Sequence, residues 1–328
     1  MKISAVDQSP IFSNSNANSA LQESVELAKE CDLIGLTRFW VAEHHGSNSF
    51  AGCSPEVLIP KIAAETESLR IGSGGVMLMH YSPYKVAENF RLLESLFPGR
   101  IDLGLGRAPG SDPHQAGALA YGSKTTGPEF FPTKMKDLTS FLVGDQPTSL
   151  AFENVSVTPG LGNIPEIWLL VSSQQGAEYA AHFGLPISLA YFINQDCLDL
   201  ADYYRQNFKP SVFSKVPIVS LGIFAICAEK DDEAERLSAS AALWRMNLQR
   251  GRFEPFKTTE ESLAIIDQDK IDISDSRTFI GSPETIYKKL MPLLEITKPD
   301  ELKVVTICEP LSKRAKSYKL LKEFFDSK

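Results

Sequence analysis

Residues 70–110 read RIGSGGVMLMHYSPYKVAENFRLLESLFPGRIDLGLGRAPG. One apolar strand candidate opens this stretch at 70–78, a second closes it at 100–106, and a helical pattern lies between them. Both candidates are apolar on consecutive residues, which is typical of parallel strands covered on both faces. The stretch therefore predicts a strand–helix–strand unit within a parallel sheet.

The same alternation continues toward both ends of the chain. Six further strand candidates lie at 2–7, 38–43, 166–173, 186–192, 217–226 and 301–307. Helical patterns separate them; the one at 19–35 has Ser19 as its expected cap and Gly35 at its end, and the one at 282–296 opens with a serine and a proline. Eight alternations predict an α/β fold, a (β/α)8 TIM barrel, with an open doubly wound sheet as the alternative.

Two connections are longer than the others, so we expect insertions after strands 4 and 7. Such insertions concentrate at one end of a barrel. Residues 148–165 have the pattern of an added hairpin, and residues 250–281, between Gly251 and Gly281, could form a lid or a plain surface insertion. No linker divides the chain, which predicts one domain over residues 1–328.

Composition excludes several classes of protein. The 33 basic and 41 acidic residues give a net charge of -8, which disfavours nucleic acid or an anionic membrane as a partner. No apolar run reaches the ~20 residues of a membrane span, and the first residues lack the apolar core of a signal peptide. The five cysteines form no CxxC pair, which is typical of reduced thiols. We expect a cytoplasmic protein.

Chemistry in such barrels sits where the strands end, and the second strand ends in Glu43, His44 and His45. Adjacent side chains on an extended chain point to opposite faces, so the two histidines are poorly placed to bind one metal ion together. We therefore expect no metal. One histidine there, with a pKa near neutrality, could act as a general acid or base. A histidine hydrogen-bonded to a neighbouring loop explains the pattern equally well.

Three glycines interrupt the third strand at positions 72, 74 and 75. Glycine weakens a strand unless the backbone needs an unusual conformation or something approaches it closely. A flat ring lying on the backbone would supply that reason. A bulge or a tight corner of the barrel would supply it as well.

The fourth and fifth strands end in residues suited to an anion. Arg107 follows the fourth strand, and Ser172, Ser173 and Gln174 lie between the fifth strand and a helix. Arginine can hold a phosphate bidentately, and a helix N-terminus offers free N–H groups. Each feature alone is commonly a salt bridge or an ordinary cap. Together, on neighbouring strands, they predict a phosphate clamp.

In this order, the motifs resemble the bacterial luciferase-like flavin monooxygenases, in particular their single-chain group. The matching stretches are RFWVAEHHG (38–46), the opening stretch 70–110, LLVSSQQGAEYAAHFGLP (169–186) and FIGSPETIYKKL (279–290). The resemblance implies a (β/α)8 barrel that binds reduced FMN at the end where the strands terminate. It also implies a homodimer formed through helices near 55–97 and a flavin reductase as partner.

The resemblance assigns roles to individual residues. His44 matches the catalytic acid or base near the flavin, and Gly74–Gly75 matches a non-proline cis peptide beneath its ring. The implied cofactor contacts are Gly74, Gly75, Val76 and Met77 at the ring and Arg107, Ser172, Ser173 and Gln174 at the phosphate. His114 and Tyr81 are weaker candidates for the substrate side.

Two departures limit the resemblance. Gly106 stands where the luciferase α chain has a reactive cysteine, and Ser172 stands where it has an acidic residue. Long-chain aldehyde specificity and light emission are therefore not carried over.

The activity that remains implied is a two-component monooxygenase. A reductase supplies FMNH2, O2 adds at flavin C4a to give a peroxyflavin, and a small organic substrate receives one oxygen atom. Three alternatives stay open: a flavin-binding protein without turnover, a deazaflavin-dependent oxidoreductase on the same barrel, and, more remotely, a metallohydrolase built on the two histidines.

Overall fold

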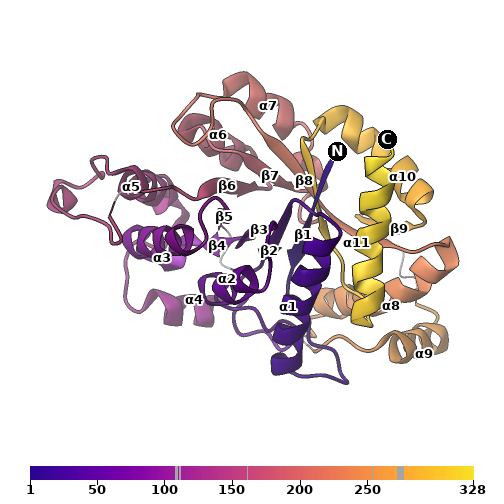
Figure 1. Cartoon of the computed structure of the whole chain (residues 1–328). Helices are drawn as coiled ribbons and strands as arrows, with labels where there is room; N and C mark the ends of the chain where they lie inside the picture. The colour runs from indigo at the N-terminus through magenta and orange to yellow at the C-terminus, as the bar shows by residue number, and fades with distance from the viewer. Residues whose placement is uncertain (108–109, 111, 161, 253, 272–276) are drawn as a thin grey trace.

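A parallel β-barrel surrounded by helices forms the centre of the protein (Figure 1). The computed structural model describes residues 1–328 except 108–109, 111, 161, 253 and 272–276. The strands are β1 (Lys2–Asp7), β2 (Arg38–Val41), β3 (Arg70–Ser73), β4 (Val76–Met77), β5 (Ile101–Gly106), β6 (Glu166–Val171), β7 (Ile187–Ala190), β8 (Val219–Cys227), β9 (Thr278–Gly281) and β10 (Glu301–Val305).

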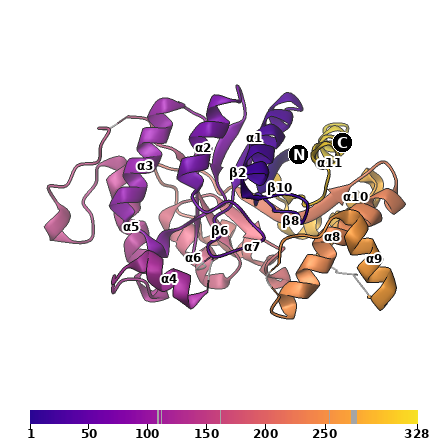
Figure 2. The same ribbon diagram turned by 90° about the horizontal axis from the view of Figure 1, so that it is seen from below.

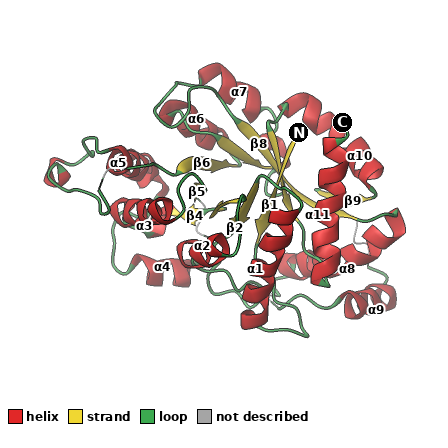
Figure 3. Cartoon of the chain, in the orientation of Figure 1, coloured by secondary structure: helices red, strands yellow, loops and turns green. Residues whose placement is uncertain are grey.

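The helices lie outside the strands, as Figure 3 shows by colour. They are α1 (Ala17–Leu33), α2 (Pro55–Ala64), α3 (Pro83–Leu96), α4 (Pro113–Ala120), α5 (Phe131–Val143), α6 (Gln174–Phe183), α7 (Leu200–Asn207), α8 (Asp231–Gln249), α9 (Thr259–Asp269), α10 (Pro283–Thr297) and α11 (Leu311–Asp326). Short 3₁₀ turns are η1 (Leu78–His80), η2 (Pro128–Phe130), η3 (Leu150–Phe152) and η4 (Gln195–Cys197). Within the described residues, no helix is long and apolar enough to span a membrane.

The sheet closes on itself, which confirms the barrel and excludes the open doubly wound sheet. The strand order is β10-β1-β2-β3-β5-β6-β7-β8, and β10 also pairs with β8. Every pairing is parallel, so all carboxyl ends of the strands meet at one end of the barrel, called the mouth below. Two short strands lie outside this cycle: β4 pairs with β5, and β9 pairs with the last residues of β8.

The sequence located the eight strands but not all of their bounds. The third candidate, 70–78, is divided into β3 and β4 around two glycines. The second ends at Val41 and not at residue 43, because the chain turns away at the mouth after the N–H of Ala42 has bonded to Asp7. Strand β9 was not predicted at all; it is only four residues long.

The ends of the helices were also predicted only in part. The N-cap of α1 is Asn16, whose side chain accepts a hydrogen bond from the N–H of Ser19, so the predicted cap at Ser19 is wrong. Gly35 follows α1 with a φ of 74°, as expected for the residue that ends a helix. Ser282 precedes α10 as predicted, but its hydroxyl bonds to Thr285 Oγ1 instead of capping a backbone N–H.

The two insertions occur where they were expected. Between β5 and β6 lie α4, η2, α5 and η3, and between β8 and β10 lie α8, α9, β9 and α10. The predicted hairpin at 148–165 is wrong, since its described residues contain η3 and turns but no strand. The segment 250–281 contains α9 and β9, while its residues 253 and 272–276 lie outside the described part. Figure 2 shows α8 and α9 on the side of the barrel away from α3 and α5.

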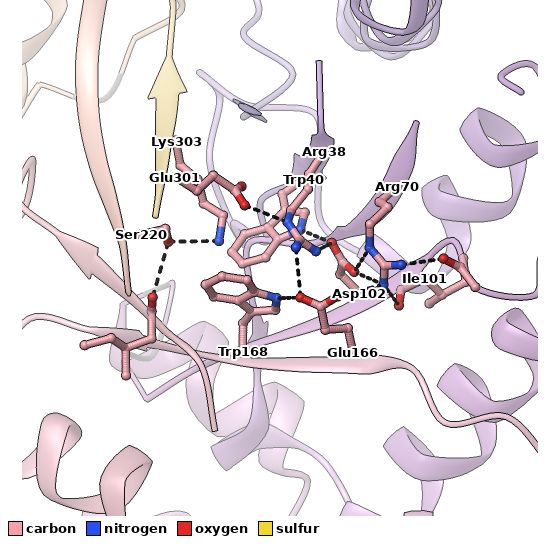
Figure 4. Close-up of polar contacts among 12 residues, drawn as sticks. Arg38, Trp40, Arg70, Ile101, Asp102, Glu166, Trp168, Ser220, Glu301 and Lys303 are labelled. Carbon is pink, nitrogen blue, oxygen red and sulfur yellow. Dashed lines mark hydrogen bonds and ion pairs between the residues drawn. The ribbon is translucent and has the colours of Figure 1, made fainter. Parts of the chain in front are cut away.

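Charged side chains fill the barrel interior at the amino ends of the strands (Figure 4). Arg38 of β2 reaches across to Asp102 of β5, Glu166 of β6 and Glu301 of β10, at 2.8, 2.9 and 3.0 Å. Asp102 also accepts hydrogen bonds from Arg70 and from the indole of Trp40. These contacts connect five strands, β2, β3, β5, β6 and β10, below the mouth.

A lysine lies between two tryptophans in the next layer of the interior. Lys303 Nζ is 3.5 Å from the ring centroids of both Trp40 and Trp168 and donates to Ser220 Oγ at 3.0 Å. Burial lowers the pKa of Lys303 to about 7, although the acid Glu301 opposes that shift. The described part of the interior below the mouth is thus packed with side chains around Lys303.

Candidate active site

The connection between β3 and β4 forms one side of the mouth, and Gly74–Met77 is called the platform below. The peptide bond between Gly74 and Gly75 is cis, as the resemblance predicted. A Cβ on Gly74 would lie 3.1 Å from Trp40 Cβ, and one on Gly75 would lie 2.6 Å from the Gly104 carbonyl oxygen. The backbone of Gly104 therefore excludes a side chain at Gly75, and Trp40 leaves little room for one at Gly74. Val76 faces outward into the core between sheet and helices, so only its backbone is available at the mouth.

Two residues of the predicted phosphate clamp, Arg107 and Ser173, lie in contact. Arg107 follows β5, and its Nη2 donates to Ser173 Oγ at 3.1 Å. Ser173 caps α6, whose N-terminal N–H groups and partial positive charge favour an anion. The two residues meet because β5 and β6 are paired neighbours. The donor set of guanidinium, hydroxyl and helix N-terminus fits a phosphate monoester.

Next to this clamp, Gln175 and not the predicted Gln174 contacts Arg107. Gln174 is exposed and its amide donates to Glu178, whereas the next residue, Gln175, accepts a hydrogen bond from Arg107 Nη1. The carbonyl of Ser172 accepts from the Asn194 amide. Sequence reasoning missed Gln175 because the phase of a helix's first turn is not set by spacing alone.

His44 follows β2 at the mouth, and its side chain is buried against an aromatic ring. Its ring stacks on Phe50 with centroids 4.5 Å apart. Burial, with a smaller contribution from His45, lowers the pKa of His44 to about 4. Nδ1 is buried and has no hydrogen-bond partner among the described residues. His44 is therefore a neutral imidazole at pH 7, which differs from the near-neutral pKa expected from sequence.

Glu43 joins the loop after β2 to the platform through hydrogen bonds, a role that the sequence did not predict. Its carboxylate, on a residue 1% exposed, accepts hydrogen bonds from His45 Nε2 at 2.7 Å, Tyr81 Oη at 2.7 Å and the Met77 N–H at 3.0 Å. The loop after β2 is thereby fixed to the platform. Tyr81 is turned toward Glu43, and burial raises its pKa further above the usual range.

The two adjacent histidines have different surroundings, as expected on an extended chain. His44 packs on Phe50, whereas His45 bonds to Glu43. Within the described residues, no three His, Cys, Asp or Glu side chains are grouped so that they could hold a metal ion. His114 is exposed on α4, and its backbone N–H bonds to Asp112.

An aromatic wall stands on the other side of the mouth. Trp244 of α8 stacks on Phe256 at 4.8 Å, contacts Phe50 at 5.2 Å and donates its indole N–H to Ser49 Oγ. The ring centroids of Phe192, which follows β7, and Phe224 of β8 lie 5.1 Å apart. Helix α8 is thus held against the loop after β2, and the site is polar at the clamp and apolar opposite it.

Comparisons with known proteins agree with this arrangement. Residues 1–296 match the family model described as luciferase-like monooxygenase. The chain is 39% identical to the uncharacterized protein YwcH of Bacillus subtilis (strain 168), over 99% of each chain. It is 34% identical to the N-acetyl-S-alkylcysteine monooxygenase of the same organism, over 98% of each.

Solved structures show the same fold. The crystal structure of apo-MsnO8 superimposes with a TM-score of 0.90 at 35% identity, covering 99% of this chain and 98% of that one. The FMN complex of the oxygenating constituent of 3,6-diketocamphane monooxygenase from Pseudomonas putida gives 0.72 at 17% identity, covering 98% and 97%. An F420-dependent secondary alcohol dehydrogenase gives 0.61 at 13%, covering 97% of each. At such low identities the last two show the fold alone.

Proposed function

The chain belongs to the luciferase-like monooxygenase family, and from this premise we propose that it is a monooxygenase dependent on reduced FMN. A separate reductase would supply the reduced flavin, and one oxygen atom of O2 would pass to a small organic substrate. When bound, the reduced flavin supplies the electrons that activate O2. The chain supplies binding, orientation, exclusion of water and control of protons.

The observation that carries this proposal is the clamp of Arg107 and Ser173 at the start of α6. It offers an arginine, a hydroxyl and a helix N-terminus to the phosphate of FMN. The platform, next to β5, offers at Gly74 and Gly75 a backbone without side chains on which a flat ring could lie. The phosphate and the ring of one FMN molecule would then be held by neighbouring segments.

His44 would handle protons in this reaction. A neutral imidazole can accept a proton or donate a hydrogen bond without carrying charge into an apolar site. Stacking on Phe50 fixes the orientation of its ring, and its buried Nδ1 has no hydrogen-bond partner among the described residues. Glu43 and His45 would instead keep the loop and the platform in place.

Replacing Arg107 with methionine is expected to weaken FMN binding about 10- to 100-fold, because a charged hydrogen-bond donor to the phosphate is lost. Riboflavin, which lacks the phosphate, is the matched control, and its affinity should not change. Equilibrium dialysis of both flavins against both proteins measures this. Equal losses for the two flavins, or tight binding of F420 with no uptake of FMN, would contradict the assignment of FMN.

The reaction itself is tested by mixing the FMNH2-loaded protein with ¹⁸O₂ and a panel of thioethers, aldehydes and ketones. N-Acetyl-S-alkylcysteines, named for one relative, are the first compounds to include. One ¹⁸O atom in a product, found by mass spectrometry, supports the proposal. Flavin oxidation without a labelled product across the panel would favour a flavin-binding protein without turnover.

We also propose that two copies pair through α2 and α3. Val57, Leu92 and Leu96 on these helices are 70%, 52% and 59% exposed, which is a large apolar exposure on adjacent elements. Leu92→Glu is expected to shift the chain from a dimer to a monomer in sedimentation velocity. Leu150→Glu, at an 80% exposed leucine elsewhere, should leave the dimer intact. A native chain that sediments as a monomer would overturn this proposal.

A further inference from the structure

The side chain of Met77 fills a space at the mouth between the platform and the phosphate clamp. Met77 pairs with Gly106, the last residue of β5, and Arg107 of the clamp follows directly. A Cβ on Gly106 would lie 3.1 Å from Met77 Sδ and 3.2 Å from its Cε. The thioether therefore takes the place that a side chain at Gly106 would otherwise occupy.

Met77 is directed toward the barrel interior and is held there. Successive side chains of a strand point to opposite faces, and Val76, its neighbour in β4, packs in the core between the sheet and the helices. A Cβ on Gly110, after β5, would lie 3.2 Å from Met77 Cγ. The Met77 N–H donates to the Glu43 carboxylate at 3.0 Å. The half-buried thioether thus has a fixed place beside the backbone on which a flavin ring would lie.

A thioether at this place is open to oxidation by the proposed reaction. When no substrate takes an oxygen atom, reduced flavin and O2 give oxidised flavin and hydrogen peroxide. One oxygen atom of the peroxide then bonds to Sδ as the O–O bond breaks, and the sulfur loses two electrons to become a sulfoxide. The other oxygen atom leaves as water with both protons. Peroxide that forms beside Met77 meets this sulfur before it reaches solvent.

Building on the proposed function, we propose that Met77 is a self-oxidation site, which becomes a sulfoxide when reduced flavin meets O2 without substrate. The sulfoxide is larger and more polar than the thioether, so it weakens FMN binding at the platform. The chain then stops consuming reduced flavin until a methionine sulfoxide reductase restores the thioether. Met77 is thus a modification site that limits wasteful turnover.

Met291 is the matched internal control. It is half-buried like Met77, but it lies on α10, outside the barrel. Peroxide dissolved in the solution would reach both side chains. Peroxide that forms at the mouth would oxidise Met77 alone.

The test passes the full chain through repeated cycles of FMNH2 and O2 without substrate. Catalase is present to remove peroxide from the solution. Mass spectrometry of the digested chain then counts added oxygen atoms, and fragment spectra separate Met77 from Met79, which is buried nearby. At least tenfold more oxidation is expected at Met77 than at Met291. Cycles with oxidised FMN in place of FMNH2 should oxidise neither.

The affinity for FMN gives a second readout. After the cycles, equilibrium dialysis is expected to show binding about tenfold weaker than before, because a thioether contact with an aromatic ring is lost. Treatment with methionine sulfoxide reductase should restore the first value. Met77→Leu, which has no sulfur to oxidise, should have the same affinity before and after the cycles.

Three results would overturn the inference: no oxidation of Met77 in a chain that binds FMN, equal oxidation of Met77 and Met291, or a loss of affinity in Met77→Leu as large as in the native chain. Dialysis before the cycles keeps this inference separate from the proposed function. A chain that takes up no FMN at the start refutes the flavin assignment itself. Bound FMN with an intact Met77 refutes the self-oxidation alone.

Discussion

His44→Ala is expected to lower the rate of substrate oxygenation by about 10²- to 10⁴-fold, the usual contribution of a positioned acid or base. FMN affinity should change little, because the clamp and the platform lie on other strands. Stopped-flow mixing of the FMNH2-loaded variant with O2 and substrate measures the rate, and equilibrium dialysis measures the affinity. His182→Ala, at an exposed histidine on α6, is the matched control and should match the native chain.

The pH dependence sharpens this expectation. The pKa of His44 is about 4 in the folded chain, against about 6.5 in an unfolded one, because burial disfavours the charged ring. The stability that comes from keeping this ring neutral is therefore full above pH 6.5 and is lost as the pH falls toward 4. The neutral form also persists through pH 5–8, so protonation of His44 should not produce a break in the rate over that range. A loss of FMN binding in His44→Ala, with the rate of the bound fraction unchanged, would show that the residue has a different role.

Asp102→Asn is expected to reduce the free energy of unfolding by about 3–5 kcal/mol, since removing one partner of a buried ion pair leaves the other charges uncompensated. The carboxylate is fully buried and receives Arg38 Nη1 at 2.8 Å, Trp40 Nε1 at 2.9 Å and Arg70 Nε at 2.8 Å. Burial alone would raise the pKa of Asp102, but the two arginines and the indole outweigh it and hold the pKa below its usual value. The midpoint and slope of urea unfolding measure the change.

The control for this substitution is an exposed ion pair. Asp202 lies 3.5 Å from Arg205 with its side chain 67% exposed, so Asp202→Asn should change stability by no more than about 0.5 kcal/mol. Because the pKa of Asp102 is lowered, its contribution is present above the ordinary aspartate pKa and is lost only as the pH falls below it. An Asp102→Asn variant within 1 kcal/mol of the native chain would show that the charges of Arg38 and Arg70 are compensated by the remaining acids.

Long apolar strands were the part of the fold that sequence predicted best. Strands such as β1 and β5 are covered on both sides, so nearly every residue is apolar or small and the pattern is unmistakable. Strand β9 was not predicted because its four residues, which pair with the end of β8, do not form a long apolar run. The hairpin expected at 148–165 failed for a related reason: Leu150 and Phe152 are 80% and 44% exposed, so their alternation reflects no sheet.

The sequence predicted those parts of the candidate site that depend on which strands are neighbours. The contact between Arg107 and Ser173 could be predicted because consecutive barrel strands lie side by side. The lowered pKa of His44 could not be predicted, since it depends on burial of the ring, to which Phe50 from the following loop contributes. The place of Trp244 could not be predicted either: in a helical pattern it is one more apolar residue, and only the packing of α8 brings its indole to Ser49.

The strand order divides the mouth into two arcs that come from different halves of the chain. The platform, the clamp and the two histidines all precede residue 176, whereas Phe192, Phe224 and Trp244 all follow it. The hydrogen bonds of Glu43 and Arg107 stay within the first arc. Two side chains of the second arc bond to the first, Trp244 to Ser49 Oγ and Asn194 to the Ser172 carbonyl. Substitutions of other second-arc residues leave these bonds in place, so related chains can vary their apolar wall while keeping the proposed cofactor contacts.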